Sequence, residues 1–193
     1  MILVVDNYDS FVNNLARYVR EAGWRTEVVR NDAMTAAEYF ALNPAGVIIS
    51  PGPKRPVDAG VSMDIIARLD PRIPLLGVCL GHQCLVEAFG GETRRARHPL
   101  HGEASEIRHD GKGVFAGVPS PMMAGRYHSL IAAPQAGNPM RPCGWSADGE
   151  LMAIRHETRP WFGVQFHPES LLTPHGRRII DNFLSCCRGK AAS

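Results

Sequence analysis

The first half of the chain alternates short, wholly apolar runs with segments whose apolar residues recur at helical spacing. The apolar runs, which predict strands, are Ile2–Val5, Thr26–Val29, Val47–Ser50 and Leu75–Cys79. The segments with helical spacing, which predict helices, are Phe11–Ala22, Ala36–Leu42, Val61–Leu69 and Leu80–Phe89. Strands that are apolar throughout and alternate with helices indicate a parallel sheet covered on both faces.

The pattern changes in the second half. Shorter strand-like pieces lie between turns rich in Gly and Pro, and they are Ser105–His109, Met122–Tyr127, Leu151–Arg155 and Gly163–Phe166. A last apolar stripe, from Ile179 to Cys187, predicts a C-terminal helix. The expected fold is α/β: a single domain over residues 1–193, with a mostly parallel central sheet, helices on both faces and short antiparallel additions.

Charge and composition exclude several functional classes. The chain carries 21 basic and 19 acidic side chains, a difference of +2, which is too even for a protein that binds nucleic acid mainly through its phosphates. No run approaches the roughly 18 apolar residues of a membrane span. The N-terminal region has no signal-peptide pattern, and the five cysteines are odd in number and irregularly spaced. We therefore expect a cytoplasmic protein with reduced thiols that binds neither nucleic acid nor a membrane.

One cysteine lies in a distinctive turn. The segment Gly77–His82, GVCLGH, joins an apolar strand to a helix and places a glycine two residues before and two residues after Cys79. This is the spacing of a nucleophile on a strained strand-to-helix turn, where neighbouring side chains would clash. The positive end of the following helix favours a thiolate, and the Leu80 N–H points to where an oxyanion would form.

Two other interpretations of this turn remain open at this point. Cysteine is among the most buried residue types, so Cys79 could be a small core residue. A metal site from Cys79 and His82 lacks a second ligand pair of suitable spacing. Cys84 lies inside the predicted helix and is expected in the core, whereas Cys186 and Cys187 point about 100° apart on a helix and suit joint ligation poorly.

A thiol nucleophile needs a base, and the base needs an orienting group. Most of the eight histidines lie in polar turns, but His167 ends the apolar strand Gly163–Phe166. Pro168 stops that strand, and Glu169 follows at a distance that lets its carboxylate fold back onto the imidazole. Because the carboxyl ends of parallel strands meet at one edge, Cys79 and His167 are expected to lie close together. The alternative for His167 is a surface residue at a strand end.

Several motifs in sequence order resemble one family. Cys79 within GVCLGHQ and His167 and Glu169 within GVQFHPES are similar to the catalytic elements of class I glutamine amidotransferases. Further motifs resemble the small subunit shared by anthranilate synthase and aminodeoxychorismate synthase. They are Asp6–Phe11, Arg30–Asp32, Ser50–Pro53, Asp58–Gly60, His101–Gly102, His109–Gly117, Arg126–Leu130 and Ile154–His156. The resemblance covers nearly the whole chain.

The resemblance implies a role for each site residue. Cys79 would attack the side-chain amide of L-glutamine, His167 would transfer protons, and Glu169 would hold the imidazole tautomer. The backbone N–H groups of Gly52 and Leu80 would bind the oxyanion. Glutamine would be recognised by Gln83, Ser129 and Leu130, and His128 beside them is expected to be structural. No cofactor or metal is implied on this chain, because Mg²⁺ belongs to the larger, chorismate-binding subunit that would receive the ammonia.

The chain also departs from the family pattern. Lys54 and Arg55 follow the SPGP motif where the family usually has Gly or another small residue and then Thr, and Lys adopts positive φ less freely than Gly. The two cations could alter this loop, attract a carboxylate or an acidic partner surface, or simply face solvent. Glu103 stands where a Lys is common, and Cys84 replaces a usual Ala. These departures concern partner docking and efficiency and leave the three proposed catalytic residues intact.

The sequence leaves three functional hypotheses. The first is a glutaminase subunit that supplies ammonia to a chorismate-using synthase, with either anthranilate or aminodeoxychorismate as the product. The second is another class I amidotransferase or a γ-glutamyl hydrolase, which the RYHSL and DNYDSF motifs disfavour. The third is a non-catalytic regulatory subunit, which the intact set of Cys79, His167 and Glu169 disfavours.

Overall fold

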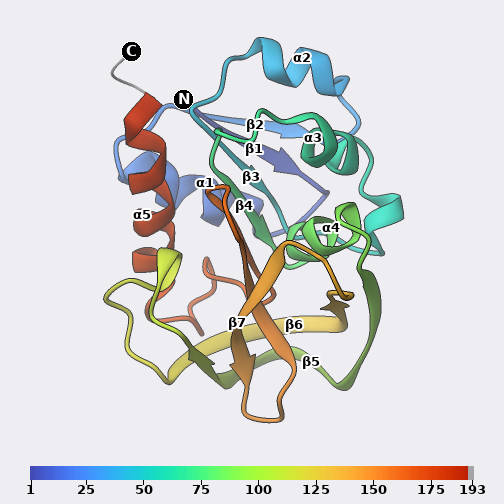
Figure 1. Ribbon diagram of the computed structural model, residues 1–193. Coiled ribbons are helices and arrows are strands. Elements are labelled where there is room, and N and C mark those ends of the chain that lie inside the picture. Colours follow the sequence, from blue (N-terminus) through green and yellow to red (C-terminus); the bar gives the residue numbers. More distant parts are fainter. Residues whose placement is uncertain (191–193) are drawn as a thin grey trace.

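A mixed β-sheet forms the centre of the molecule in the computed structural model (Figure 1). The structure describes residues 1–190, and within them nine strands lie in the order β2-β1-β3-β4-β9-β8-β7-β5-β6. The strands are β1 (Ile2–Asp6), β2 (Thr26–Arg30), β3 (Gly46–Ile49), β4 (Leu75–Val78), β5 (Glu92–His109), β6 (Met122–Ala133), β7 (Met140–Ser146), β8 (Leu151–His156) and β9 (Trp161–Val164). The α-helices are α1 (Val12–Glu21), α2 (Ala36–Ala41), α3 (Ser62–Arg68), α4 (Leu80–Ala88) and α5 (Gly176–Cys187), and short 3-10 turns lie at Pro56–Asp58, Gly113–Phe115 and Arg188–Lys190.

Five neighbouring strands, β2, β1, β3, β4 and β9, are parallel, as the apolar runs predicted. Alternate side chains of β1 enter two separate cores, because successive residues of a strand point to opposite faces. Ile2 and Val4 pack with Leu15 of α1 in one cluster. Leu3 and Val5 pack with other helices in a second cluster. A strand that is buried on both faces must be apolar throughout, and this accounts for its sequence.

The helices cover both faces of the sheet, as expected. Helices α1 and α5 lie on one face, and α2, α3 and α4 lie on the other (Figure 1). The apolar stripe of α5, which includes Ile179, Ile180 and Phe183, is fully buried against the first face. On the other face, Ile65 of α3 and Leu85 of α4 are equally buried. The α/β fold class predicted from the sequence is confirmed.

The antiparallel part of the sheet is larger than the sequence pattern indicated. Strand β5 has 18 residues and pairs with the 12-residue β6 and with β7. The beginning of β5 contains charged residues and a proline, and most of it is exposed, so it shows no apolar run. The sequence pattern does not indicate β7, because Pro142 and Gly144 interrupt this strand and its register against β8 shifts there.

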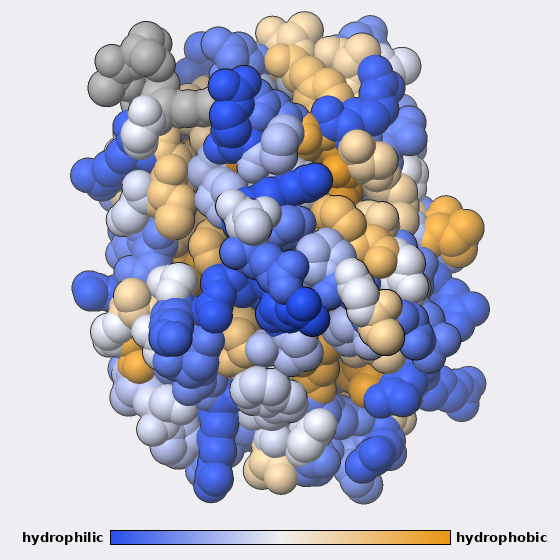
Figure 2. Space-filling view, viewed as in Figure 1, coloured by the Kyte–Doolittle hydropathy of each residue, from blue (hydrophilic) through white to orange (hydrophobic). Residues whose placement is uncertain are grey.

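The surface is mainly polar on the face that Figure 2 shows, where apolar residues form small groups between charged ones. Among the residues that the structure describes, no helix is both long enough and apolar enough to cross a membrane.

Candidate active site

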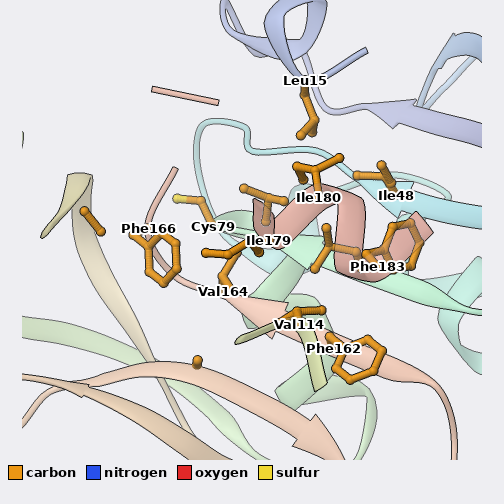
Figure 3. Close-up of a cluster of buried hydrophobic side chains, with 14 of the residues drawn as sticks. Leu15, Ile48, Cys79, Val114, Phe162, Val164, Phe166, Ile179, Ile180 and Phe183 are labelled. Carbon is orange, nitrogen blue, oxygen red and sulfur yellow. The ribbon is translucent and has the colours of Figure 1, made fainter. Parts of the chain in front are cut away.

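Cys79 occupies a strained turn at the junction of β4 and α4. Its backbone φ of 51° and ψ of −98° are unusual for a residue with a side chain, and strain of this kind gathers at functional sites. It is the residue immediately before α4, so its sulfur lies near the positive end of that helix. The side chain is 7% exposed and lies at the margin of the apolar cluster in Figure 3. The strained turn predicted from the sequence is present.

The two flanking glycines are required by close backbone approaches. A Cβ on Gly77 would lie 2.4 Å from the carbonyl oxygen of Gly81, and a Cβ on Gly81 would lie 2.4 Å from the carbonyl oxygen of Ile49. Side-chain carbons do not approach carbonyl oxygens this closely, so α4 can begin directly above β3 and β4 only because both positions lack a side chain. Because Leu80 is the first residue of α4, its backbone N–H has no partner within the helix.

The imidazole of His167 follows β9, which pairs directly with β4. The N–H of Cys79 donates to the carbonyl oxygen of Val164 at 2.8 Å, extending that pairing to the site. His167 Nδ1 lies 2.6 Å from Glu169 Oε1, and both side chains are buried. The expected convergence of the two strand ends is therefore seen, with Cys79 and His167 lining one cavity.

The other ring nitrogen of His167 is available for proton transfer. Nε2 is buried and makes no hydrogen bond to any residue in 1–190. Burial alone would lower the pKa of His167, but the nearby Cys79 and the Glu169 carboxylate outweigh burial and raise the pKa well above its ordinary value. An imidazole with a raised pKa beside a sulfur favours a thiolate–imidazolium pair.

Gly52 lies opposite the start of α4, in a loop held by Asn7. A Cβ on Gly52 would lie 2.5 Å from Asn7 Cβ and 3.0 Å from Leu80 Cδ2. Buried Asn7 fixes this loop, since its N–H donates to Ser50 Oγ at 2.9 Å and its side-chain amide donates to the Ser50 carbonyl at 3.0 Å. The two residues expected to bind an oxyanion, Gly52 and Leu80, are thus neighbours.

A cavity of about 150 Å³ extends from Cys79 on one side. Its lining includes five of the predicted site residues, namely Gly52, Cys79, Gln83, Ser129 and Leu130. Lys54, with φ of 70°, also lines this cavity and is the one Lys or Arg side chain among the described residues around it. Lys54, the first of the two residues that depart from the family pattern after SPGP, therefore lines this cavity and adopts the positive φ that a glycine would adopt more easily.

A second cavity, of about 470 Å³, meets the first at Cys79. It is lined by His167, by the segment Tyr8–Phe11 and by His101. Tyr127 borders both cavities, and its ring packs edge-on against His167 at 4.9 Å between centroids. The sulfur thus has access to two separate spaces, one lined by the expected glutamine-binding residues and one by the DNYDSF motif.

Comparison with known proteins identifies the family. The family model for class-I glutamine amidotransferases matches residues 3–186. The chain belongs to this family.

Other members of the amidotransferase family are closely similar. The aminodeoxychorismate synthase component 2 of Escherichia coli is 47% identical over 188 residues, which are 95% of this chain and 99% of the relative. The aminodeoxychorismate/anthranilate synthase component 2 of Bacillus subtilis is 46% identical over 192 residues, which are 97% of each chain. The bifunctional protein TrpGD of Thermotoga maritima is 49% identical over 188 residues, and the matched part is 32% of its length.

A solved structure shares the fold of this amidotransferase. The crystal structure of a protein described as a GMP synthase subunit, from Thermoplasma acidophilum, superposes with a TM-score of 0.88 at 28% sequence identity. The match covers 98% of this chain and 94% of that chain. The mixed sheet with helices on both faces is therefore an architecture that this amidotransferase shares with an experimentally determined structure.

Several buried residues at the site of this amidotransferase had no role in the sequence analysis. They are Asn7, Arg126, Glu150 and Gln165. Asn7, Arg126 and Gln165 lie inside motifs that carry the family resemblance, but their side chains bond to residues distant in sequence. His128, expected to be structural, is buried, and its pKa is lowered to about 4 by burial and by Arg126. Its ring bonds to Arg126 and to the Leu130 carbonyl.

None of the other four cysteines of the amidotransferase is among the residues that line the two cavities at Cys79. Cys84, Cys143 and Cys187 are buried, and burial raises the pKa of each thiol. Cys186 is exposed on α5. In residues 1–190, no group of three or more His, Cys, Asp and Glu side chains is placed to hold a metal ion.

Proposed function

We propose that this chain is the glutaminase subunit of a chorismate-using synthase: it hydrolyses L-glutamine through a Cys79 thioester and passes ammonia to a larger subunit. The proposal rests on Cys79, held on a strained turn at a helix N-terminus, beside an imidazole whose Nδ1 lies 2.6 Å from a buried carboxylate. These are a nucleophile, a base and an orienting group in the arrangement that acyl transfer requires.

In the proposed reaction the Cys79 thiolate attacks the side-chain amide carbon of glutamine. The carbonyl π electrons move to oxygen, and the N–H groups of Leu80 and Gly52 bind the resulting oxyanion. His167 then gives its Nε2 proton to the nitrogen as the carbon–nitrogen bond breaks, so ammonia leaves and a thioester remains. His167 next takes a proton from water, which attacks the thioester and releases glutamate and the thiolate. Glu169 keeps the imidazole oriented throughout.

Glutamine is proposed to bind in the smaller cavity. Gln83 is buried on α4, and its side-chain amide donates to the Leu130 carbonyl at 3.1 Å, which joins the helix to the Ser129–Leu130 segment. The size of this cavity suits a small amino acid, and its polar lining can recognise the α-carboxylate and α-amino groups. Lys54 is placed to attract the α-carboxylate, one of the alternatives left open by the sequence.

The larger cavity is proposed as the path of ammonia toward the partner subunit. Its lining includes Tyr8, which is 51% exposed, and His101, and they belong to two of the motifs that resemble the small synthase subunit, DNYDSF and HG. Leu171, which directly follows the HPES segment, is 94% exposed and adds apolar surface there. Related proteins named as synthase component 2 support a larger chorismate-binding partner, with either anthranilate or aminodeoxychorismate as the product.

Labelling of Cys79 tests this proposal. A glutamine analogue with an electrophile in place of its amide is expected to modify Cys79 in a one-to-one ratio in the presence of the partner, and excess glutamine is expected to compete. Cys79→Ser should take up no label, whereas Cys84→Ala should label like the natural protein because Cys84 is buried away from the cavities. Absence of both labelling and glutamine hydrolysis in the folded complex would refute the enzymatic role and favour a regulatory role.

A further inference from the structure

A chain of buried hydrogen bonds connects an ion pair to the Cys79 sulfur. It begins at Arg126, whose guanidinium pairs with Glu150 at 2.5 Å, and both side chains are nearly inaccessible to solvent. Arg126 Nε donates to His128 Nε2 at 3.1 Å, and His128 Nδ1 lies 3.0 Å from the Leu130 carbonyl oxygen. The ion pair thereby holds the segment that carries Leu130.

The chain continues through two glutamine side chains. The Gln83 amide nitrogen donates to the Leu130 carbonyl at 3.1 Å and to Gln165 Oε1 at 3.1 Å. The Gln165 amide nitrogen lies 3.5 Å from Cys79 Sγ, within the range of a hydrogen bond to sulfur. Gln165 is completely buried and Gln83 is 3% exposed, so these amides have few alternative partners in solvent.

Each bond in this chain has one possible direction. A guanidinium can only donate, so His128 Nε2 must accept, and the ring must carry its proton on Nδ1 and donate it to the Leu130 carbonyl. A carbonyl can only accept, so the Gln83 nitrogen must face Leu130. The second N–H of the Gln83 amide needs an acceptor, so the oxygen of the Gln165 amide must face Gln83. The nitrogen of the Gln165 amide therefore faces the sulfur of Cys79.

We propose that Gln165 is a further catalytic residue that donates an N–H to Cys79 Sγ and stabilises its thiolate, and that Arg126, Glu150 and His128 are positioning residues that fix this orientation. The inference rests on the proposed function for its purpose, since a thiolate is the attacking form of Cys79. A hydrogen bond to a charged acceptor is stronger than one to a neutral acceptor, so the Gln165 amide favours the thiolate over the thiol.

The charged end of this series of hydrogen bonds, the Arg126–Glu150 ion pair, is separated from the sulfur by three neutral side chains. Glu150 is held by a second donor, the N–H of Arg97 at 2.6 Å, and Asp148 lies 3.9 Å from the Arg126 guanidinium. The ion pair is therefore a fixed anchor. It acts on Cys79 only through the position of the neutral groups between them.

The pH dependence of Cys79 alkylation tests the proposal without requiring glutamine turnover. The full chain is treated with iodoacetamide from acid to alkaline pH, and the peptide that contains Cys79 is quantified by mass spectrometry. In Gln165→Met, a side chain of similar length without a donor, the midpoint of the alkylation profile should rise by about one pH unit, a tenfold loss of thiolate below the midpoint. The titratable and charged groups that line the two cavities, apart from Cys79 itself, are the same in both proteins. They are Tyr8, Asp9, Lys54, His101, Tyr127, His128 and His167, together with Glu169.

A matched control removes a buried amide elsewhere. Asn138→Leu deletes an amide that is 3% exposed and bonds to the Val86 and Phe89 carbonyls at the far end of α4. This variant should lose stability but keep the midpoint of the natural protein. A Gln165→Met midpoint equal to that of the natural protein would overturn the proposal.

The role of His128 in the series of hydrogen bonds is tested separately. This test also keeps the proposal open to refutation if Gln165→Met does not fold. His128→Leu removes both ring nitrogens, and its midpoint should shift in the same direction by a smaller amount. His128→Asn keeps a donor near the Nδ1 position and should recover part of that shift. His156→Leu, at a buried histidine that ends β8 and packs against Phe89, should leave the midpoint unchanged. If His128→Leu and the natural protein had equal midpoints, Arg126 and His128 would not be positioning residues for Gln165.

The outcomes separate this inference from the proposed function. A shifted midpoint without glutamine hydrolysis in the complex would support the hydrogen bond and refute the enzymatic role. Glutamine hydrolysis with an unshifted midpoint would support the enzymatic role and refute the part assigned to Gln165.

Discussion

His167 Nδ1 and Glu169 Oε1 lie 2.6 Å apart, although only Pro168 separates the two residues in sequence. A strand end followed by proline turns the chain back so that the carboxylate meets the ring. Because the carboxylate accepts a hydrogen bond from Nδ1, the neutral ring carries its proton on Nδ1, and Nε2 is the ring nitrogen left for Cys79. Two residues that are neighbours but one in sequence are enough to set this tautomer.

Replacing the orienting carboxylate should impair turnover more than folding. In Glu169→Gln the imidazole loses its charged acceptor, so the pKa of His167 should fall and the thiolate–imidazolium pair should become less populated at neutral pH. We expect kcat for glutamine hydrolysis in the complex to drop by roughly 100- to 10,000-fold. Steady-state kinetics with a thermal melt of the same protein checks this, and unchanged kcat would remove Glu169 from the mechanism.

The turn at Cys79 should not tolerate a methyl group at Gly81. The new Cβ would lie 2.4 Å from the Ile49 carbonyl oxygen, so α4 must move away from β3. We expect Gly81→Ala to lower the free energy of unfolding by roughly 1–3 kcal/mol, as overpacking does. Denaturant unfolding measures it against Gly189→Ala, a glycine with no atom within 4 Å of an added Cβ. Equal stability of the two variants would contradict the close approach.

The positive φ of Lys54 lowers the stability of the folded protein, and glycine at this position would remove the strain. With φ of 70° it occupies a region that disfavours side chains, and Lys54→Gly should raise the free energy of unfolding by up to about 1 kcal/mol. Lys54→Ala keeps the Cβ and should bring no such gain. If the ammonium attracts the glutamine carboxylate, both variants should also raise KM for glutamine. A thermal melt in which Lys54→Gly is the least stable of the three proteins would contradict the strain argument.

Two buried histidines should make the fold sensitive to acid. Burial lowers the pKa of His82 to about 3 and that of His128 to about 4, from an ordinary value near 6.5. As pH falls from about 6.5 toward 4 the unfolded chain takes up protons that the folded chain does not, so the free energy of unfolding decreases over this range.

Denaturant unfolding at several pH values checks this sign. His82→Asn should show a shallower decrease between about pH 6.5 and about pH 4.5 than the natural protein, because one of the two histidines is gone. His98→Asn, at an exposed position, should follow the natural protein. Identical slopes for His82→Asn and the natural protein would contradict a neutral His82 in the folded state.

The sequence predicts the parts of this molecule that depend on local pattern. Gly77 and Gly81 flank Cys79 at fixed spacing, and β4 and β9 are apolar, so the turn and the meeting of two strand ends follow from short segments. Strand β5 is different, because its charged first half is a strand only through pairing with β6. Non-local pairing of polar residues leaves no periodic signal.

The hydrogen-bond chain could not be predicted for a related reason. Gln165 and Cys79 are 86 positions apart, and Arg126 and Glu150 are 24 apart, so only the folded chain shows that they meet. Gln165 is a polar residue in an otherwise apolar strand end, which is the one local sign that its side chain has a buried partner. The sequence does indicate the unusual position of Lys54, because a long side chain follows a loop motif after which the family usually has a small residue, and Lys54 adopts a positive φ.

The most direct test of the central claim compares two nitrogen sources in the complex with the larger synthase subunit. Cys79→Ser should abolish synthesis of the aminated product of chorismate when glutamine is supplied, and should leave synthesis from free ammonia at the level of the natural complex. Loss of both activities would show that Cys79 is structural, and retention of glutamine-dependent synthesis would show that it is not the nucleophile.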